Sequence, residues 1–273
     1  LDSYKDASNL NLVGSLESAY EYISFNLGKY DEASEKNIMD ENAKMNDVKL
    51  RQAIAYAIDT KTAGEKLYNG LYHPATSLII SFFGDLHDSE VEGYSYDPDK
   101  ANELLDEAGY KDVDGDGIRE GKDGKEFKIT FAARKRTEAN EALVQQYIAW
   151  WKEVGLNVEL YTGRTVEINT FYDAIQANDA SIDMYAGGWS TGYDPNPNGL
   201  WGETAPFNMS RFVDEKNTEL LDAIGSVASF DEKTNLKNYK AWQEYAFEQA
   251  FAIPTFESEA ITALNKRVKN FDT

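Results

Sequence analysis

The chain has 273 residues, of which 42% are hydrophobic and 27% are charged, values that fit a folded globular protein and argue against disorder or a membrane-spanning chain. Its 48 acidic and 27 basic residues give a formal net charge of −21, which argues against nucleic acid or an anionic lipid surface as a partner. The absence of cysteine excludes disulfides, thiolate metal ligands and cysteine nucleophiles.

The sequence begins at Leu1, without an initiator Met and without the basic and apolar regions of a signal peptide. We therefore expect residues 1–273 to be one domain excised from a longer chain, so that any export signal or lipid anchor lies outside the sequence.

The first half of the chain carries one strand signal and two helix signals. Residues 20–27 mix aromatic and polar side chains as a strand does. Asp47 is placed to cap a helix whose apolar residues recur at helical spacing over 50–58, and Asp97 is placed to cap a second helix that Gly109 ends.

The central region predicts a strand, a helix and a strand in succession. Residues 127–131 alternate as a half-buried strand, a long helix follows until Gly155, and residues 156–160 alternate again. This order is typical of a right-handed crossover onto a parallel sheet. Trp150 and Trp151 lie on the apolar face of the helix, so we assign them to the core.

The last part predicts two more helices, over residues 216–228 and 235–250. Residues 251–256 form a short apolar run that contains a proline, which indicates an edge strand or the entry to a strand. Taken together, the elements predict the α/β class, with a mixed, mostly parallel sheet flanked by helices.

The segment 181–208 is the strongest candidate for a binding site. It opens as a short apolar strand and then becomes a loop of Gly, Pro and Asn that carries Trp189, Tyr193 and Trp201. A long aromatic loop at a strand end is a common way to build a binding site. The alternative is that the rings cap the edge of the core and that the Asp-Pro-Asn-Pro run from Asp194 is only a rigid turn.

The segment 112–123 resembles a calcium loop. Aspartates occupy its first, third and fifth places, a glycine the sixth and a carboxylate the twelfth, so that side chains converge on one hard cation. The terminal Asp, where Glu is usual, and the early apolar residue weaken the match, and an acidic turn between helix and strand remains the alternative. The candidate ligands are Asp112, Asp114, Asp116, the Ile118 carbonyl, and Glu120 or Asp123.

Other candidates for chemistry are weaker. The basic run Arg134-Lys135-Arg136 follows a predicted strand, where it could meet a ligand carboxylate or simply be a solvated turn. The two histidines, His73 and His87, show no pattern of a nucleophile elbow or a zinc helix. A hydrolase that uses a pair of carboxylates remains an alternative, because the many acidic residues supply such pairs by chance.

Several segments together resemble the bacterial extracellular solute-binding proteins that deliver oligopeptides and dipeptides to ABC importers. The likeness touches nearly the whole chain in order. It covers Phe25-Asn26, the run from Val48 to Asp59, Tyr72-His73-Pro74-Ala75, Gly188-Trp189 with Tyr193 and the following Asp-Pro, Ile253-Pro254, and the run from Asn265 to Lys269. The family is longer, and this chain matches its carboxyl-terminal lobe only.

The resemblance implies a periplasmic-binding-protein-like lobe that forms one side of a peptide cleft. Trp189 would flank the peptide and Tyr193 would support the same loop. Gly192 stands where the family often has an Asp that pairs with the ligand's amino terminus, and Asp194 is a possible substitute. With Asn208 at the end of the loop, these residues are the candidate ligand-binding set.

The implied function is the substrate-binding component of an ABC transporter, without catalysis. Its partners would be an oligopeptide, the amino-terminal lobe of the same protein and a membrane permease, with no nucleic acid and as a monomer. It would lie outside the cell or in the cell envelope, anchored by a lipid. We expect the isolated lobe to bind peptide weakly, because half of the contacts are missing. Another solute on the same fold, such as a sugar, a nickel chelate or a signalling peptide, stays open.

Overall fold

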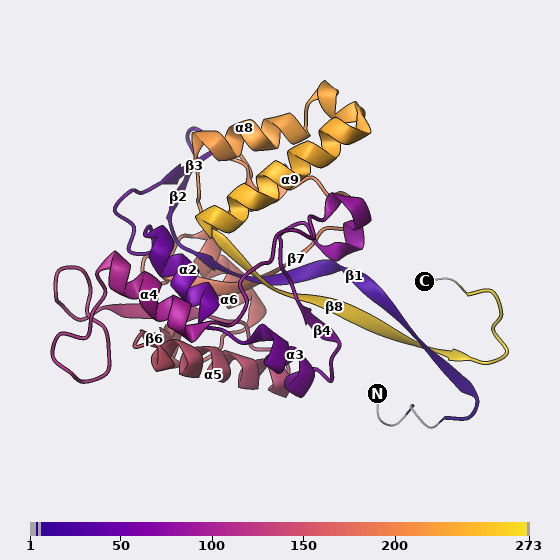
Figure 1. Cartoon of the computed structure of the whole chain (residues 1–273), viewed down its shortest axis with the longest axis horizontal. Coiled ribbons are helices and arrows are strands. Elements are labelled where there is room, and N and C mark those ends of the chain that lie inside the picture. The colour runs from indigo at the N-terminus through magenta and orange to yellow at the C-terminus, as the bar shows by residue number, and fades with distance from the viewer. Residues whose placement is uncertain (1–3, 5–6, 272–273) are drawn as a thin grey trace.

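The computed structural model describes residues 4 and 7–271 (Figure 1). Within them, six strands form one sheet in the spatial order β4-β8-β1-β7-β5-β6, and two short strands form a separate hairpin, β2-β3. The strands are β1 (Leu10–Phe25), β2 (Gly28–Asp31), β3 (Lys36–Met39), β4 (Tyr72–Pro74), β5 (Lys128–Ala132), β6 (Asn157–Leu160), β7 (Met184–Ser190) and β8 (Ala252–Asn265).

Helices cover both faces of this sheet, with α8 and α9 on one side and α3 and α5 on the other (Figure 1). The α-helices are α2 (Val48–Tyr56), α3 (Thr60–Leu67), α4 (Pro98–Ala108), α5 (Glu138–Glu153), α6 (Ile168–Gln176), α7 (Asn198–Trp201), α8 (Glu215–Ile224) and α9 (Glu232–Gln249). Short 3₁₀ turns are η1 (Ser81–Leu86), η2 (Tyr161–Gly163) and η3 (Val227–Phe230).

The mixed α/β class is confirmed, but the sheet is less parallel than the sequence predicted. Strand β5 pairs in parallel with β6 and β7, as the predicted strand, helix, strand unit requires. The other three pairings, β1 with β7, β1 with β8 and β4 with β8, are antiparallel. The prediction that parallel pairs predominate is wrong because it was based on the one crossover unit visible in the sequence.

Strands β1 and β8 form a long two-stranded ribbon that extends beyond the body (Figure 1). Its register runs from Ser24 opposite Ala252 to Leu10 opposite Asn265. Strand β8 lies between β4 and β1, so the prediction of a short edge strand at residues 251–256 is wrong. The alternative, that these residues are the entry to a strand, is confirmed, because β8 begins at Ala252. Pro254 is tolerated there because the register shifts next to it, where a missing N–H breaks no regular ladder.

The predicted helix caps are present. The Asp47 side chain accepts a hydrogen bond from the Lys49 amide, and Asp97 accepts one from the Lys100 amide. Gly109 ends α4 with a φ of 93°, a left-handed conformation that glycine adopts at low cost. These local signals depend only on neighbouring residues, which explains why the sequence was sufficient to find them.

Helix α5 packs the two predicted tryptophans into the core. Trp151 is fully buried, and its indole Nε1 donates to the Ile54 carbonyl of α2 at 3.0 Å. Its ring meets that of Phe131 on β5 edge to face, with centroids 5.1 Å apart. Trp150 is also buried, so the assignment of both to the core is confirmed.

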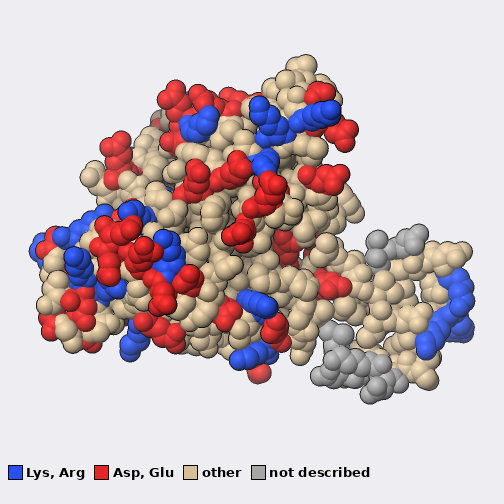
Figure 2. Space-filling view, in the orientation of Figure 1, with Lys and Arg blue, Asp and Glu red and all other residues tan. Residues whose placement is uncertain are grey.

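Acidic side chains form several groups across the surface in Figure 2, with lysine and arginine between them. This distribution agrees with the net charge of −21. None of the helices within residues 4 and 7–271 combines the length and apolar character needed to span a bilayer.

Candidate functional site

The candidate site is built on an open edge of β7. Along one edge this strand pairs with β1 from Ser190 to Met184. Along the other edge it pairs with β5 only at Met184 and Tyr185. From Ala186 to Ser190, therefore, no strand of the described residues covers that second edge. Main-chain N–H and C=O groups of an uncovered edge can pair with another extended chain.

The edge is open because β5 leaves β7 after Ala132. The following residues pair with Val166 instead: its amide donates to the Ala133 carbonyl at 3.0 Å, and the Lys135 amide donates to the Val166 carbonyl at 2.7 Å. The carboxyl ends of the two parallel strands thus separate. A crevice at such a point is where ligands commonly bind in open α/β sheets.

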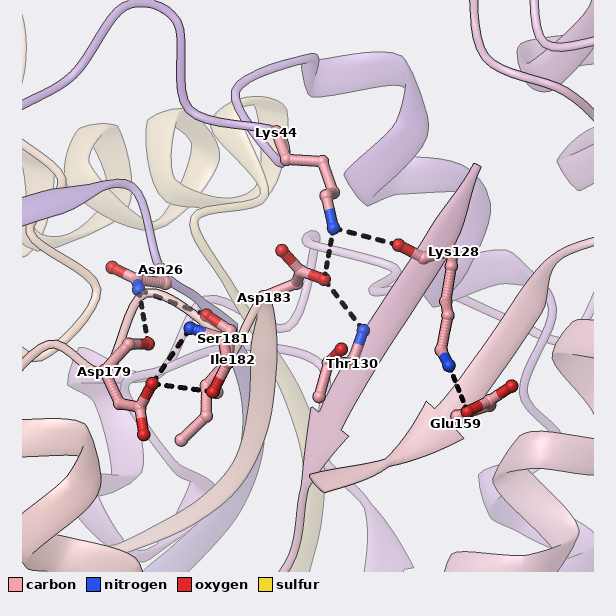
Figure 3. A network of polar contacts seen from close by, with 9 residues as sticks. All are labelled: Asn26, Lys44, Lys128, Thr130, Glu159, Asp179, Ser181, Ile182 and Asp183. Carbon is pink, nitrogen blue, oxygen red and sulfur yellow. Dashed lines mark hydrogen bonds and ion pairs between the residues drawn. The ribbon is translucent and has the colours of Figure 1, made fainter. Parts of the chain in front are cut away.

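At their amino ends the same two strands are held together by Asp183 (Figure 3). Its carboxylate accepts from the Thr130 amide at 2.8 Å and from Lys44 Nζ at 2.7 Å. Lys44 Nζ also donates to the Lys128 carbonyl at 2.9 Å. Because β5 and β7 are fastened here and diverge at the other end, the opening has a fixed position. No local sequence pattern predicts this network, because its members lie far apart in the chain.

The basic run after β5 lies beside the opening, and its members differ. Arg134 is half-buried, with its guanidinium carbon 5.9 and 5.6 Å from the ring centroids of Phe171 and Tyr172. Its Nη2 is 3.1 Å from the position that a Cβ on Gly188 would occupy, a tight contact, so the guanidinium lies close against the main chain of β7. Lys135 is exposed, whereas Arg136 forms an ion pair with Glu21 of β1.

Aromatic residues at the end of β7 and on the loop after it form an aromatic surface with an open face. The Trp189 ring is half-buried and lies 5.5 Å from that of Phe207, whose side chain is 45% exposed. Tyr193 is 91% exposed, and its ring is 6.1 Å from that of Phe82 in η1. The alternative in which the rings only seal the core is therefore excluded for Tyr193, whereas it holds for Trp201, which is 2% exposed and belongs to the core.

Asn208 does not belong to the ligand-binding set in this structure, which corrects the prediction. It is fully buried and donates through Nδ2 to the carbonyls of Gly202 and Phe212 at 3.1 and 2.9 Å. Its Oδ1 accepts from Ser210 Oγ at 2.7 Å. An amide at the end of a Gly- and Pro-rich loop can satisfy buried main-chain groups as well as a ligand, and here it stabilises the loop.

Gly192 and Asp194 lie beside Tyr193 on the surface. Gly192 has a φ of 60°, which favours glycine at this turn, and the space around it is open. The exposed Asp194 carboxylate accepts from the Asn196 amide at 3.0 Å. Burial, and next the charge of Asp194, raise the pKa of Tyr239 to about 12. Recognition of a ligand's amino terminus by Asp194 stays a prediction.

The acidic loop brings together three of its six candidate metal ligands. One carboxylate oxygen each of Asp112, Asp114 and Asp116 lie within 4.8 Å of one another, at the surface. The loop is closed by hydrogen bonds from the amides of Gly115 and Gly117 to the Asp112 carboxylate.

The remaining candidate carboxylates of this loop point to other partners. Glu120 accepts from the Val113 amide at 2.7 Å, and Asp123 pairs with Lys125 at 2.9 Å. The main-chain carbonyl of Ile118 lies in the same loop and stays a candidate ligand. The three aspartates therefore fit part of a calcium site, and a bound ion stays a prediction.

We expect calcium to stabilise the protein through this loop. With a dissociation constant of about 0.1 mM, as in many extracellular calcium sites, a hundredfold excess would add about 2.7 kcal/mol and raise Tm by about 5–10 °C. Differential scanning fluorimetry with and without calcium measures the shift. The paired substitution of Asp112→Asn and Asp116→Asn should abolish it, and Asp123→Asn should leave it unchanged. No shift in the parent protein would contradict the site.

Comparison with protein-family models matches residues 1–211 to the bacterial extracellular solute-binding proteins, family 5 Middle. Among curated proteins, the oligopeptide-binding protein OppA of Lactococcus lactis subsp. cremoris (strain SK11) is 36% identical over 273 residues, which cover 97% of this chain and 45% of that protein. The oligopeptide-binding protein AppA of Bacillus subtilis (strain 168) is 26% identical over 257 residues, covering 91% of this chain and 44% of that protein.

Solved structures give the same result for the fold. Lactococcal OppA complexed with an endogenous peptide in the closed conformation has a TM-score of 0.92 and 34% identity, over 99% of this chain and 50% of that one. AppA from Bacillus subtilis in complex with a nonapeptide has a TM-score of 0.80 at 20% identity, over 100% of this chain and 51% of that one, a likeness of fold. The chain spans about half the length of the relatives it matches. Since the family model matches most of the chain, this protein belongs to family 5 of the bacterial extracellular solute-binding proteins.

Proposed function

We propose that the protein containing this chain binds extracellular oligopeptides for uptake by an ABC importer, and that this chain forms one wall of the binding cleft. The observation that carries the proposal is the open edge of β7, from Ala186 to Ser190, beside an aromatic surface that includes Tyr193. The names of the relatives at 36 and 37% identity, both oligopeptide-binding proteins, support it.

The edge explains how one site can accept many sequences. An extended peptide lying along β7 would exchange main-chain hydrogen bonds with it, and these do not depend on side chains. Trp189 and Tyr193 would flank the peptide with rings that need little ordering on binding. Asp194 is the candidate partner of the peptide's amino terminus.

A second lobe of the same protein would cover the peptide from the other side. The aromatic surface is open, and the ribbon of β1 and β8 extends away from the body as a connection between lobes would. A membrane permease would recognise the closed form of the two lobes, which forms when the site is filled. The protein would act as a monomer, held at the cell surface by a lipid anchor.

The test is to mix the full-length protein with a peptide library and to identify by mass spectrometry what co-purifies. Intact peptides are expected. Recovery of cleavage products would instead favour a hydrolase that uses carboxylates, and recovery of no peptide would contradict the proposal. Sugars or metal chelates in the same eluate would identify the other solutes that this fold can bind.

Titration calorimetry with a recovered peptide tests the wall itself. We expect Trp189→Ala and Tyr193→Ala each to weaken binding by about 10-fold or more, as for aromatic residues at the centre of an interface. Tyr96→Ala is the matched control, because Tyr96 is also exposed at 41% but lies beside Trp150. Equal effects at all three positions would show that the wall has no special role.

The chain alone should bind the same peptide at least about 100-fold more weakly than the full-length protein, because the ordering cost of a peptide is offset only when both walls contact it. Tight binding to residues 1–273 alone would contradict the two-lobe arrangement, without affecting the assignment of the peptide as ligand.

A further inference from the structure

The short turn η3, which joins α8 to α9, exposes apolar side chains to solvent. Phe230 is 91% exposed and Val227 is 81% exposed. Among the large hydrophobic side chains of the described residues, only Tyr193 is as exposed as Phe230. Ala228 is exposed as well. We refer to Val227, Ala228 and Phe230 together as the η3 tip.

The turn is held in a fixed conformation by its polar side chains. Residues three apart in a 3₁₀ turn lie on the same side. Ser226, which precedes the turn, and Ser229 share one side, and each hydroxyl donates to the Ala223 carbonyl at 2.8 Å. Asn238 of α9 also donates to Ser229 Oγ, at 3.0 Å. The two large residues of the η3 tip share another side, so the turn holds them toward solvent, where burial against another body would be favourable.

The helix that follows the η3 tip also borders the candidate peptide site. Helix α9 begins at Glu232, and its Tyr239 is seven residues further along. Burial, and next the charge of Asp194, raise the pKa of Tyr239, which places Asp194 near this part of the helix. Seven residues of α-helix measure roughly 10 Å. The η3 tip therefore lies a short distance along α9 from the loop that carries Tyr193 and Asp194.

The amino-terminal lobe of the proposed two-lobe protein can reach this surface. The relatives are about twice as long as this chain. A second lobe would join the ribbon of β1 and β8 at its far end, where the Lys266 amide donates to the Asn9 carbonyl at 2.9 Å. The end of α9 next to η3 lies on the same side of the body as this ribbon, the right in Figure 1. A lobe of similar length would be roughly 40–50 Å across, so a lobe that covers Tyr193 would also reach the η3 tip.

We propose that the η3 tip binds the amino-terminal lobe of the same protein when the two lobes close on a peptide. The proposal rests on the proposed peptide-binding function and adds a contact between the lobes that does not involve the peptide. The tip would be open without peptide and covered with it. Because the contact is made only in the closed form, it would favour that form and slow the release of the peptide.

Other occupants fit this surface less well. Two copies of a chain with a net charge of −21 would repel each other. Exposed charged residues beside the tip, Asp231, Glu232 and Lys233, suit the polar rim of a contact between proteins. A membrane permease is the alternative partner, and it would use the tip without changing peptide affinity.

Hydroxyl-radical footprinting of the full-length protein, measured by mass spectrometry, tests whether the tip becomes covered. Saturation with a recovered peptide should lower the oxidation rate of Phe230 several-fold, together with that of Tyr193 in the peptide site. Tyr96 is the control, because it is 41% exposed and lies beside Trp150, and it should react equally in both states. An unchanged rate at Phe230 would contradict the proposal.

Titration calorimetry measures how much the tip contributes to binding. Phe230→Ser should weaken the binding of two unrelated recovered peptides by the same factor, about 10-fold, as for an aromatic residue in a contact between proteins. The factors should agree because the tip does not touch the peptide. Val113→Ser, which replaces a 64% exposed apolar side chain on the acidic loop, is the matched control and should leave binding unchanged. Circular dichroism confirms that each variant is folded, and footprinting of the parent protein decides the question if Phe230→Ser is not.

The outcomes separate this proposal from the function on which it rests. If the parent protein binds no peptide, the peptide-binding function fails. If peptides bind but Phe230→Ser binds them as the parent does, the contact between lobes fails and the peptide-binding function stands. Normal binding by this variant with loss of peptide uptake by cells would assign the tip to the permease instead. Unequal factors for the two peptides would place Phe230 in the peptide site and would also overturn the proposal.

Discussion

Replacing Arg51 by Met should lower the free energy of unfolding by about 3–5 kcal/mol, because four main-chain carbonyls lose their donor at once. Arg51 is 1% exposed, and its guanidinium donates at 2.7–3.2 Å to the carbonyls of Met45, Asn46, Gln249 and Ala250. It thereby joins the start of α2 to the end of α9. Burial lowers the pKa of Arg51 to about 10, so the group is still charged at neutral pH.

Methionine would fill much of the space and pack against the apolar neighbours, but it has no hydrogen-bond donor. The four carbonyls would therefore stay buried without partners. Urea unfolding at neutral pH measures the change. Arg267→Met, which removes an exposed arginine, is the matched control and should change stability by less than about 0.5 kcal/mol. A loss below about 1 kcal/mol for Arg51→Met would show that the carbonyls find other donors.

Replacing Trp151 by Ala should cost a similar amount, about 3–5 kcal/mol, for a different reason. The side chain is fully buried between α5, β5 and α2, and its ring stacks near that of Tyr147 with centroids 5.6 Å apart. Truncation would leave a large cavity that the surrounding elements can fill only in part.

Trp151→Phe separates packing from hydrogen bonding. Phenylalanine retains most of the apolar contact but leaves the Ile54 carbonyl without its indole donor, so a loss of about 1–2 kcal/mol is expected. If alanine and phenylalanine destabilise the protein equally in urea unfolding, the hydrogen bond, and not the volume, would dominate at this position.

The sequence predicted the fold correctly wherever the signal came from neighbouring residues. Asp47 and Asp97 cap their helices as expected, and β5, α5 and β6 follow from a change of apolar period. The sequence did not predict which distant strands pair with one another. Nothing in the alternation of residues 10–25 says that they pair with both β7 and β8, because pairing depends on a partner far away in the chain.

For the candidate site, too, the sequence predicted some features and not others. The composition of the loop after β7 left open whether its rings face a ligand or the core, and the structure shows one of each: Tyr193 is exposed and Trp201 is buried. Asn208 was assigned wrongly because a polar residue in a loop can face a ligand or the loop's own main chain, and composition does not distinguish the two. For Arg134, contact with a ligand or with solvent stayed open, since its position depends on where β5 parts from β7.

The central place of β1 in the sheet has a consequence for biosynthesis. This strand leaves the ribosome before its hydrogen-bonding partners on both sides, such as Ser190 for Ala19 and Asn265 for Leu10. Contacts of such long range fold slowly and leave the main-chain groups of this strand unpaired while translation continues. Until β7 and β8 have both been made, β1 can pair with the wrong segment, and a chaperone that holds unfolded segments would protect it during that time.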